Sequence, residues 1–314
     1  MVIKNVVSAM RKVKKANFQL TDHRLEKIYA PLGVEILSSP QAWEKFVWTR
    51  ALFPQKPKEG YFVWVKKTIP LPLVTCVYLS KVKTNQHLEN LIVLEKGVRG
   101  KMLAHCQALS PFLSGRHWGR STIILKSESK LKIEHRHQFG EKDIVFPLIK
   151  ARVGKGAVMD YFYENSQAKE KVNLESIIEV EKEGRVEVKV SLRAIGALVK
   201  MKENLILKGR KARGTVRLRL VAEKRAKIKA ESYLEAKGAG QGHLDCQGLL
   251  LSEEGEISLI PALIDKNRGA LLTHEASIGK IKEEALAYLR ARGFSEREAV
   301  NLLVTGFLKN NFKE

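Results

Sequence analysis

The sequence has few cysteines and no uninterrupted apolar run long enough to cross a membrane. Its 314 residues include three cysteines, Cys76, Cys106 and Cys246, which are too few and too widely spaced for a disulfide framework, and no Cys-x-x-Cys zinc pair occurs. The most apolar window, residues 69–79, is interrupted by two prolines and falls short of the roughly 18 apolar residues of a membrane span. These absences predict reduced thiols, no membrane association and a soluble, cytoplasmic protein.

Nucleotide-binding and hydrolase motifs are also missing. Gly279 and Lys280 are followed by isoleucine and lack the upstream glycine of a phosphate loop. Residues 238–242 have neither the spacing nor the following helix of a dinucleotide fingerprint, and no Gly-x-Ser-x-Gly elbow occurs. We therefore expect a protein that binds no nucleotide directly and is no self-sufficient enzyme. If ATP drives its cycle, another subunit must bind that ATP.

Positive charge exceeds negative charge by a wide margin. The chain has 56 basic and 34 acidic residues, for a formal net charge of +22, which would attract nucleic acid, an anionic membrane or an acidic protein. The charge is spread along the chain, and its densest part, residues 208–229, alternates Arg and Lys with apolar residues, as a strand with one solvated face does. A basic nucleic-acid-binding β-protein is therefore an alternative function, although the charge pattern makes nucleic acid an unlikely partner.

The first part of the chain has apolar residues at helical spacing. Residues 1–60 are predicted to form an N-terminal helical region, in which Leu25 and Tyr29, and then Trp43 and Phe46, follow a helical period. Residues 1–20 are predicted to be its first amphipathic helix, with an organellar transit peptide as the alternative. The Pro- and Lys-rich residues 54–60 indicate a loop at the boundary.

Beyond this loop, residues 61–272 show short alternating runs that predict strands, such as residues 186–190 and 216–221. Almost no helical pattern separates them, which disfavours a globular α/β enzyme. Because a strand that cannot bury its own face must stack on its neighbours, regular punctuation predicts a solenoid of β-coils or a long two-sheet sandwich. The predicted turns recur every 12 to 15 residues, at Gly184, Gly196, Lys211, Arg225, Gly240, Gly255 and Gly269.

Helical periodicity returns in residues 273–314. A helix is predicted over residues 280–292, with Gly293 after its last turn as a C-cap. A second helix is predicted after Ser295, whose hydroxyl forms a capping box with Glu298. The chain thus reads as helices, a long β-region and a helical tail.

Three residues supply the donor types that iron and iron–sulfur species accept. Cys246 lies on the same predicted strand face as Leu244 and Gly248, which by itself favours a small buried cysteine. His274 and Glu275 lie between the last predicted strand and the C-terminal helix, where such a pair is more often structural. Thiolate, imidazole and carboxylate together nevertheless form a mixed ligand set that iron accepts.

Two further histidines, His135 and His137, share one face of a predicted strand. Their spacing permits metal binding. The intervening Arg136 and its charged neighbours favour an ordinary solvated strand instead.

The C-terminal sequence resembles a known family. Residues 273–308, which begin Thr-His-Glu-Ala-Ser-Ile-Gly-Lys-Ile, resemble the C-terminal signature of the SufB/SufD family of iron–sulfur cluster assembly scaffolds. The Gly-Leu-Leu-Leu run after Cys246 and the Ile-Pro-Ala-Leu run at residues 260–263 extend the resemblance over residues 240–308. The resemblance implies a mainly β protein with a right-handed parallel β-helix core, here residues 61–272, flanked by N-terminal and C-terminal helical regions.

The resemblance also implies roles for individual residues. Cys246 matches the cysteine that SufB needs for cluster formation, and Glu275 matches an acidic residue implicated as a ligand. His274 falls where SufD carries a histidine that faces that cysteine across the subunit interface. Because SufD proteins usually have His-Gly here, the chain is SufB-like, although it is much shorter than common SufB proteins. A weaker match after Cys106, at residues 115–119, makes Cys106 the candidate sulfur acceptor, whereas Cys76 matches no known role.

By the same resemblance, the protein is a scaffold for a transient iron–sulfur cluster that is handed to apo-protein clients. It implies a SufC-type ABC ATPase as partner, docking on the C-terminal helical region, and pairing as a homodimer or as a heterodimer with a SufD-like subunit. A purely structural SufD-like subunit is the third alternative. The predicted anchors for the ATPase are Leu286, Leu289, Leu302 and Leu303.

Overall fold

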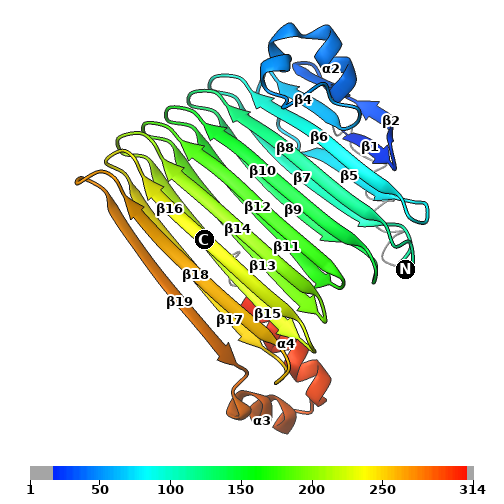
Figure 1. The fold of residues 1–314 in the computed structure, drawn as a ribbon, viewed down its shortest axis with the longest axis vertical. Coiled ribbons are helices and arrows are strands. Elements are labelled where there is room, and N and C mark those ends of the chain that lie inside the picture. The colour runs from blue at the N-terminus through cyan, green and yellow to red at the C-terminus, as the bar shows by residue number, and fades with distance from the viewer. Residues whose placement is uncertain (1–16, 310–314) are drawn as a thin grey trace.

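A computed structural model describes residues 17–309 of the chain, in which two mainly parallel sheets face each other and form a β-solenoid (Figure 1). From β4 and β5 onward, consecutive strands alternate between the two sheets, so each coil adds one strand to each sheet. The mainly β fold and the parallel β-helix core predicted from the sequence are confirmed, and the alternative of a sandwich is wrong.

In spatial order the first sheet contains β19 (Leu271–Lys280), β17 (Gln241–Leu250), β15 (Arg213–Glu223), β13 (Arg185–Ile195), β11 (Val158–Ala168), β9 (Lys130–Gln138), β7 (Arg99–Ala108), β5 (Leu73–Leu79), β1 (Asn17–Thr21) and β2 (Arg24–Tyr29). The second contains β18 (Glu256–Asp265), β16 (Lys227–Ala236), β14 (Leu198–Leu207), β12 (Lys171–Val180), β10 (Ile144–Val153), β8 (Arg116–Leu125), β6 (Asn85–Leu94), β4 (Tyr61–Val65) and β3 (Val34–Ser38).

The core lies between the two sheets and follows from strict alternation. In β12, every second residue from Val172 to Val180 is buried and the residues between them are partly exposed. Strand alternation therefore sends one set of side chains inward and leaves the charged set in solvent. Each coil stacks in register on the next, so that Val172 of β12 pairs with Val199 of β14 and Val199 with Ile228 of β16. This in-register stacking buries the apolar faces that no single coil could bury alone.

All seven predicted turns fall between consecutive strands. Gly196, for example, connects β13 to β14 with a φ of +69°, a backbone conformation that glycine adopts without steric cost. Lys211 and Glu183 adopt similar positive φ angles at other corners. The regular spacing of turn residues in the sequence therefore reflects the regular length of the strands and turns that make up each coil.

The N-terminal end corrects the prediction of a helical region. The predicted helix over residues 1–20 lies mainly outside the described residues, and its last four residues belong to β1. Leu25 and Tyr29 lie in β2, which pairs antiparallel with β1, while β1 adds in parallel to β5. The helix prediction for this segment is wrong because backbone pairing with the open edge of a sheet outweighs the helical spacing of two or three apolar residues.

Part of the helical prediction is correct. Helix α2 (Ser39–Lys45) begins with a capping box at Ser38, and a 3₁₀ helix, η1 (Val47–Ala51), follows it. Trp43 and Phe46 pack in a cluster of buried and half-buried side chains beside β4 and β6. Residues 54–60 form the predicted loop, but β3 and β4 pair antiparallel across it. The cluster covers the outer face of the second sheet at β4 and β6, near the N-terminal end of the solenoid.

The C-terminal end differs because β18 and β19 are the last strands of their sheets. Strand β19 continues to Lys280, beyond the predicted core boundary at residue 272, and the helical tail is α3 (Glu283–Ala291) and α4 (Glu296–Lys309). Gly293 follows α3 with a φ of +92°, and Ser295 forms the predicted capping box with Glu298. No helix within residues 17–309 has the length and apolar character needed to span a bilayer.

Candidate functional site

Cys246 lies inside the solenoid, next to its C-terminal end. It is 1% exposed on β17, in register with Leu218 of β15 and Ala276 of β19. Its Sγ lies 3.9 Å from Oγ of Ser232. Burial is the main cause that raises the pKa of the Cys246 thiol to about 11. A neutral, covered thiol fits the expectation of a small buried cysteine, yet only the last coil separates this one from the end of the molecule.

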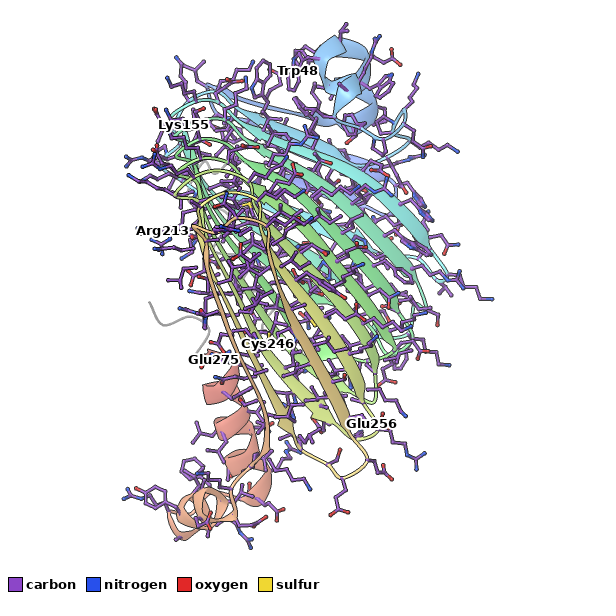
Figure 2. All side chains as sticks on the ribbon, turned by 60° about the vertical axis from the view of Figure 1, so that its left-hand side comes forward. Trp48, Lys155, Arg213, Cys246, Glu256 and Glu275 are labelled. Carbon is purple, nitrogen blue, oxygen red and sulfur yellow. The ribbon has the colours of Figure 1, made fainter. Side chains whose placement is uncertain are left out.

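The other two predicted ligands lie on different faces of β19. His274 is in register with the buried Leu244, so alternation places it on the inner face with Cys246. Glu275 is in register with Asp245 and lies on the outer face, where its Oε1 is 3.7 Å from Nε2 of His243. The structure therefore brings Cys246 and His274 to one face and places Glu275 on the other. Figure 2 shows Cys246 and Glu275 at the end of the solenoid opposite Trp48.

The outer face of β17 is held by a buried ion pair. Arg219 of β15 contacts both carboxylate oxygens of Asp245, at 2.8 and 2.6 Å. Both side chains are 9% exposed, and bidentate geometry offsets the desolvation of the two charges better than a single contact does. This pair joins β15 to β17 on the outer face, at the residue that precedes Cys246.

A buried carboxyl near Cys246 escaped the sequence analysis. Glu203 of β14 is 2% exposed, is in register with Ser232 of β16, and accepts a hydrogen bond from the Ser176 hydroxyl. Burial is the main cause that raises its pKa to about 7. The sequence does contain a signal, because Glu203 occupies an inward position in the alternation of Val199 and Leu205. Ser232 thus lies between this carboxyl and the Cys246 thiol.

Cys106 lies in the core, far from any open end. It is 5% exposed on β7, and burial raises the pKa of its thiol well above the usual range. Because a thiolate is the sulfur nucleophile, this environment disfavours direct attack on an external sulfur donor, and the sulfur-accepting role stays a prediction. The solvated-strand interpretation of His137 is wrong, since this side chain is 3% exposed and lies in the core with His135 and Cys106.

The last coil leaves apolar side chains and strand edges uncovered. Within residues 17–309, strand β18 pairs only with β16, and β19 pairs only with β17. On these two strands Leu271 is 60% exposed, Ile278 is 45% exposed and Ile260 is 40% exposed. Natural sheets normally cover or charge their edges, so this end has the character of an interface.

The predicted ATPase anchors differ in exposure. On α4, Ala299 and Val304 are buried, and the helix packs on β13 and β15, where Arg193 donates a hydrogen bond to the side-chain oxygen of Asn301. Leu302 is 48% exposed, whereas Leu303 on α4 and Leu286 and Leu289 on α3 are half-buried. Of the four leucines, Leu302 alone offers an open apolar surface.

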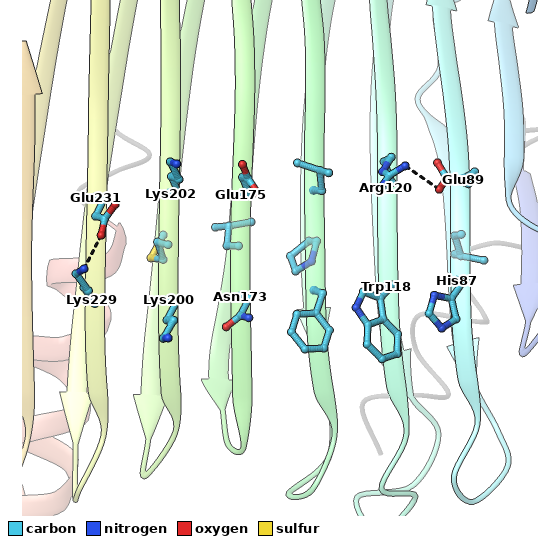
Figure 3. A pocket seen from close by; sticks show the side chains of 16 residues that line it. His87, Glu89, Trp118, Arg120, Asn173, Glu175, Lys200, Lys202, Lys229 and Glu231 are labelled. Atoms are coloured by element: carbon cyan, nitrogen blue, oxygen red, sulfur yellow. Dashed lines mark ion pairs between the residues drawn. The ribbon is translucent and has the colours of Figure 1, made fainter. Parts of the chain in front are cut away.

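An outer groove of about 560 Å³ crosses the second sheet (Figure 3). His87 stacks on Trp118 at 4.3 Å between ring centroids, and Trp118 stacks on Phe146 at 4.8 Å. Farther along the same face, cations pair with carboxylates, as in Lys229 with Glu231 at 2.6 Å. A platform for nucleic-acid bases needs free ring faces and unpaired cations. Here the three rings stack on one another, and two of the four Lys and Arg side chains that line the groove, Arg120 and Lys229, pair with carboxylates.

Comparison with known proteins identifies relatives over nearly the whole chain. The family model described as "SUF system FeS cluster assembly, SufBD core domain" matches residues 77–307. An "Iron-sulfur cluster assembly SufBD family protein" of Archaeoglobus fulgidus is 28% identical, over 99% of this chain and 89% of that protein.

The matches to two further relatives cover less of this chain. A protein of the same description from Methanothermobacter thermautotrophicus is 27% identical over 79% of this chain, and the match spans 62% of that longer protein. The "Iron-sulfur cluster assembly SufBD family protein ycf24" of Galdieria sulphuraria is 40% identical over 29% of this chain and 39% of that protein. For the Galdieria sulphuraria protein, the higher identity applies to a segment of 90 aligned residues.

Proposed function

The chain belongs to the SufBD family of SUF-system iron–sulfur cluster assembly proteins, and from this premise we propose that it is the scaffold on which a cluster forms before delivery to apo-protein clients. The observation that carries the proposal is the position of Cys246, one strand inside an uncovered end of the solenoid. The cluster is cargo, so the site must hold it and then release it. The chain itself has no catalytic role in this proposal.

The ligand set suits temporary binding. A Cys246 thiolate is the soft, strong ligand for iron, whereas His274 and Glu275 are harder and more exchangeable. Iron binding must displace the proton of a thiol whose pKa is raised to about 11, so it becomes more favourable as pH rises toward that value. Because Cys246 is covered by the last coil, cluster assembly requires that β18 and β19 move.

We propose that a second subunit covers the open end. Two copies that pair through β18 and β19 would satisfy the free strand edges and bury exposed side chains such as Leu271. A twofold axis at this contact brings Cys246, His274 and Glu275 of both chains close together, including the carboxylate that lies on the outer face of each. A SufD-like subunit can occupy the same place in a heterodimer.

The energy for moving the last coil is proposed to come from a SufC-type ATPase that docks on α3 and α4. Exposed apolar side chains on this tail, Tyr288, Phe294 and Leu302, provide the contact surface. Since α3 follows β19 after two residues, a displacement of the helices is transmitted directly to the strand beside Cys246.

Two alternatives predict different behaviour. A purely structural subunit would fold and pair as described but retain no cluster. Nucleic-acid binding, suggested by the charge of +22, would decline steeply between low and moderate salt and would not depend on any thiol. The stacked rings and paired cations of the outer groove offer this alternative little support.

Anaerobic reconstitution with ferrous iron and sulfide tests the proposal. After desalting, the full chain should show a sulfide-to-iron charge-transfer spectrum and should transfer iron and sulfide to an apo-ferredoxin. A folded protein that emerges without chromophore at pH 7 and at pH 9 would contradict the scaffold role and leave the structural-subunit alternative.

A further inference from the structure

A second group of metal-ligand side chains lies inside the solenoid, separate from Cys246. Donor atoms of Cys106, His117 and His137 all lie within 4.8 Å of one another, and all three residues are buried. Cys106 on β7 and His137 on β9 come from the first sheet, and His117 on β8 comes from the second. The group therefore bridges the two sheets across the core.

His135 places a fourth donor beside two of these three, Cys106 and His137. Its Nε2 is 3.4 Å from Sγ of Cys106 and 2.8 Å from Nε2 of His137. In a tetrahedral site with metal–nitrogen distances of about 2.0–2.1 Å and a metal–sulfur distance of about 2.3 Å, neighbouring donor atoms lie roughly 3.3–3.7 Å apart. The contact to sulfur already fits this range, and the two imidazole nitrogens need to separate by only about 0.5 Å.

Each imidazole is oriented by an oxygen on its other nitrogen. Nδ1 of His117 lies 2.6 Å from Oε1 of Gln86, an acceptor that requires a proton on Nδ1 and so leaves Nε2 with a free lone pair. The hydroxyls of Tyr161 and Tyr163 lie 3.0 and 3.1 Å from Nδ1 of His135 and His137. Metal-binding histidines in proteins are held by oxygen partners in this way.

We propose that Cys106, His117, His135 and His137 form an internal binding site for a divalent transition metal of the zinc type. Sulfur and imidazole donors without a carboxylate favour zinc over magnesium, calcium or manganese. Binding releases the thiol proton of Cys106. The imidazole that carries its proton on Nε2 moves it to Nδ1, where the tyrosine oxygen accepts it, so three neutral imidazoles and one thiolate face the metal.

The protonation state of the free site is suited to this chemistry. Burial lowers the pKa of His117 to about 3 and that of His135 to about 4, and it also lowers the pKa of His137 well below its ordinary range. All three imidazoles are therefore neutral at pH 7, which is the form that binds a metal. In this proposal Cys106 acts as a metal ligand, a role that is compatible with its burial.

Cobalt(II) and zinc(II) test this site on the full-length protein. The parent should bind one Co²⁺ per chain, with visible bands of tetrahedral intensity and a near-ultraviolet thiolate-to-cobalt band, and Zn²⁺ should displace it. Cys106→Ala should eliminate the thiolate band, and His117→Ala should weaken Co²⁺ binding by at least about tenfold. Cys76→Ala and Cys246→Ala should leave both signals unchanged, which separates this site from the proposed cluster site.

A measurement on the unaltered chain covers the case in which a core variant fails to fold. Zinc-edge X-ray absorption should give one sulfur and three nitrogen donors. The proposal is overturned if the folded parent binds no stoichiometric Co²⁺ or Zn²⁺, if zinc has only oxygen and nitrogen neighbours, or if folded Cys106→Ala retains the thiolate band.

Discussion

Cys246 of β17 lies in register with Ala276 of β19, so the preceding residue, Glu275, lies on the opposite face of the sheet from the thiol. His274 shares the inner face with Cys246. Within one chain, His274 can therefore reach a metal bound by Cys246, whereas Glu275 cannot. Variants of the two residues should have different effects on cluster binding.

We expect His274→Ala to reduce the iron taken up during reconstitution more than Glu275→Ala does. Glu275→Ala should instead shorten the time for which a formed cluster survives a chelator, because its carboxylate acts in the paired state. The measurements are iron per chain after desalting and the decay of the chromophore. His243→Ala, an exposed neighbour of Glu275 on the outer face, serves as the control. Parental uptake by His274→Ala would remove this residue from the site.

Pairing through the open end depends on exposed apolar side chains of β18 and β19. The double variant Ile260→Asp/Leu271→Asp places charges on this edge and should convert a dimer into a monomer in light-scattering chromatography. Phe112→Asp is a matched control, because Phe112 is 74% exposed in the turn between β7 and β8. A dimer that survives the double variant and is lost in the control would place the interface elsewhere.

Docking of the ATPase depends on Leu302. Deletion of all residues after Arg292 should abolish co-purification with a SufC-type ATPase, but it also uncovers the part of β13 and β15 on which α4 packs. Leu302→Asp is the sharper test, since this side chain is 48% exposed and its loss leaves the packing of α4 intact. Leu198→Asp, on β14, is the control. Equal co-purification of Leu302→Asp and parent would contradict docking on this helix.

Glu203 should make stability depend on pH. Its folded-state pKa is about 7, against an ordinary value of 4.5, so the folded chain binds its proton more tightly than the unfolded chain. The free energy of unfolding should therefore fall as pH rises from 4.5 to 7 and level off above 7.

Glu203→Gln keeps a hydrogen-bonding partner for Ser176 and should raise stability at pH 8 by about 3 kcal/mol at most. Urea titrations at pH 5 and pH 8 measure this, and exposed Glu254→Gln is the control. An unchanged pH slope in Glu203→Gln would show that this carboxyl does not titrate as described.

The β-solenoid could be predicted because its information is local and repeated. Turn residues such as Gly196 and Lys211 recur at the coil corners, and alternation within each strand marks the inner face. The N-terminal strands could not be predicted in the same way. Whether Leu25 lies in a helix or a strand is decided by the edge that β5 offers to β1, a partner about 50 residues away in the sequence.

The internal histidine group was missed for a similar reason. Alternation placed His135 and His137 on one strand face, but it could not show whether that face was wet or buried, and Arg136 suggested solvent. His117 and Cys106 join them only because successive coils stack in register and the two sheets face each other. A donor set that spans three strands becomes visible only in three dimensions.

Iron and sulfide content after anaerobic reconstitution of Cys246→Ser tests the central claim most directly. Cys76→Ser is the matched control, since both cysteines are buried and Cys76 lies on β5, distant in sequence and in sheet order from the open end. We predict that the control retains the parental chromophore, iron and sulfide, whereas Cys246→Ser loses all three. A folded Cys246→Ser protein with the same iron, sulfide and visible spectrum as the parent would contradict the account and leave Cys246 a structural core residue.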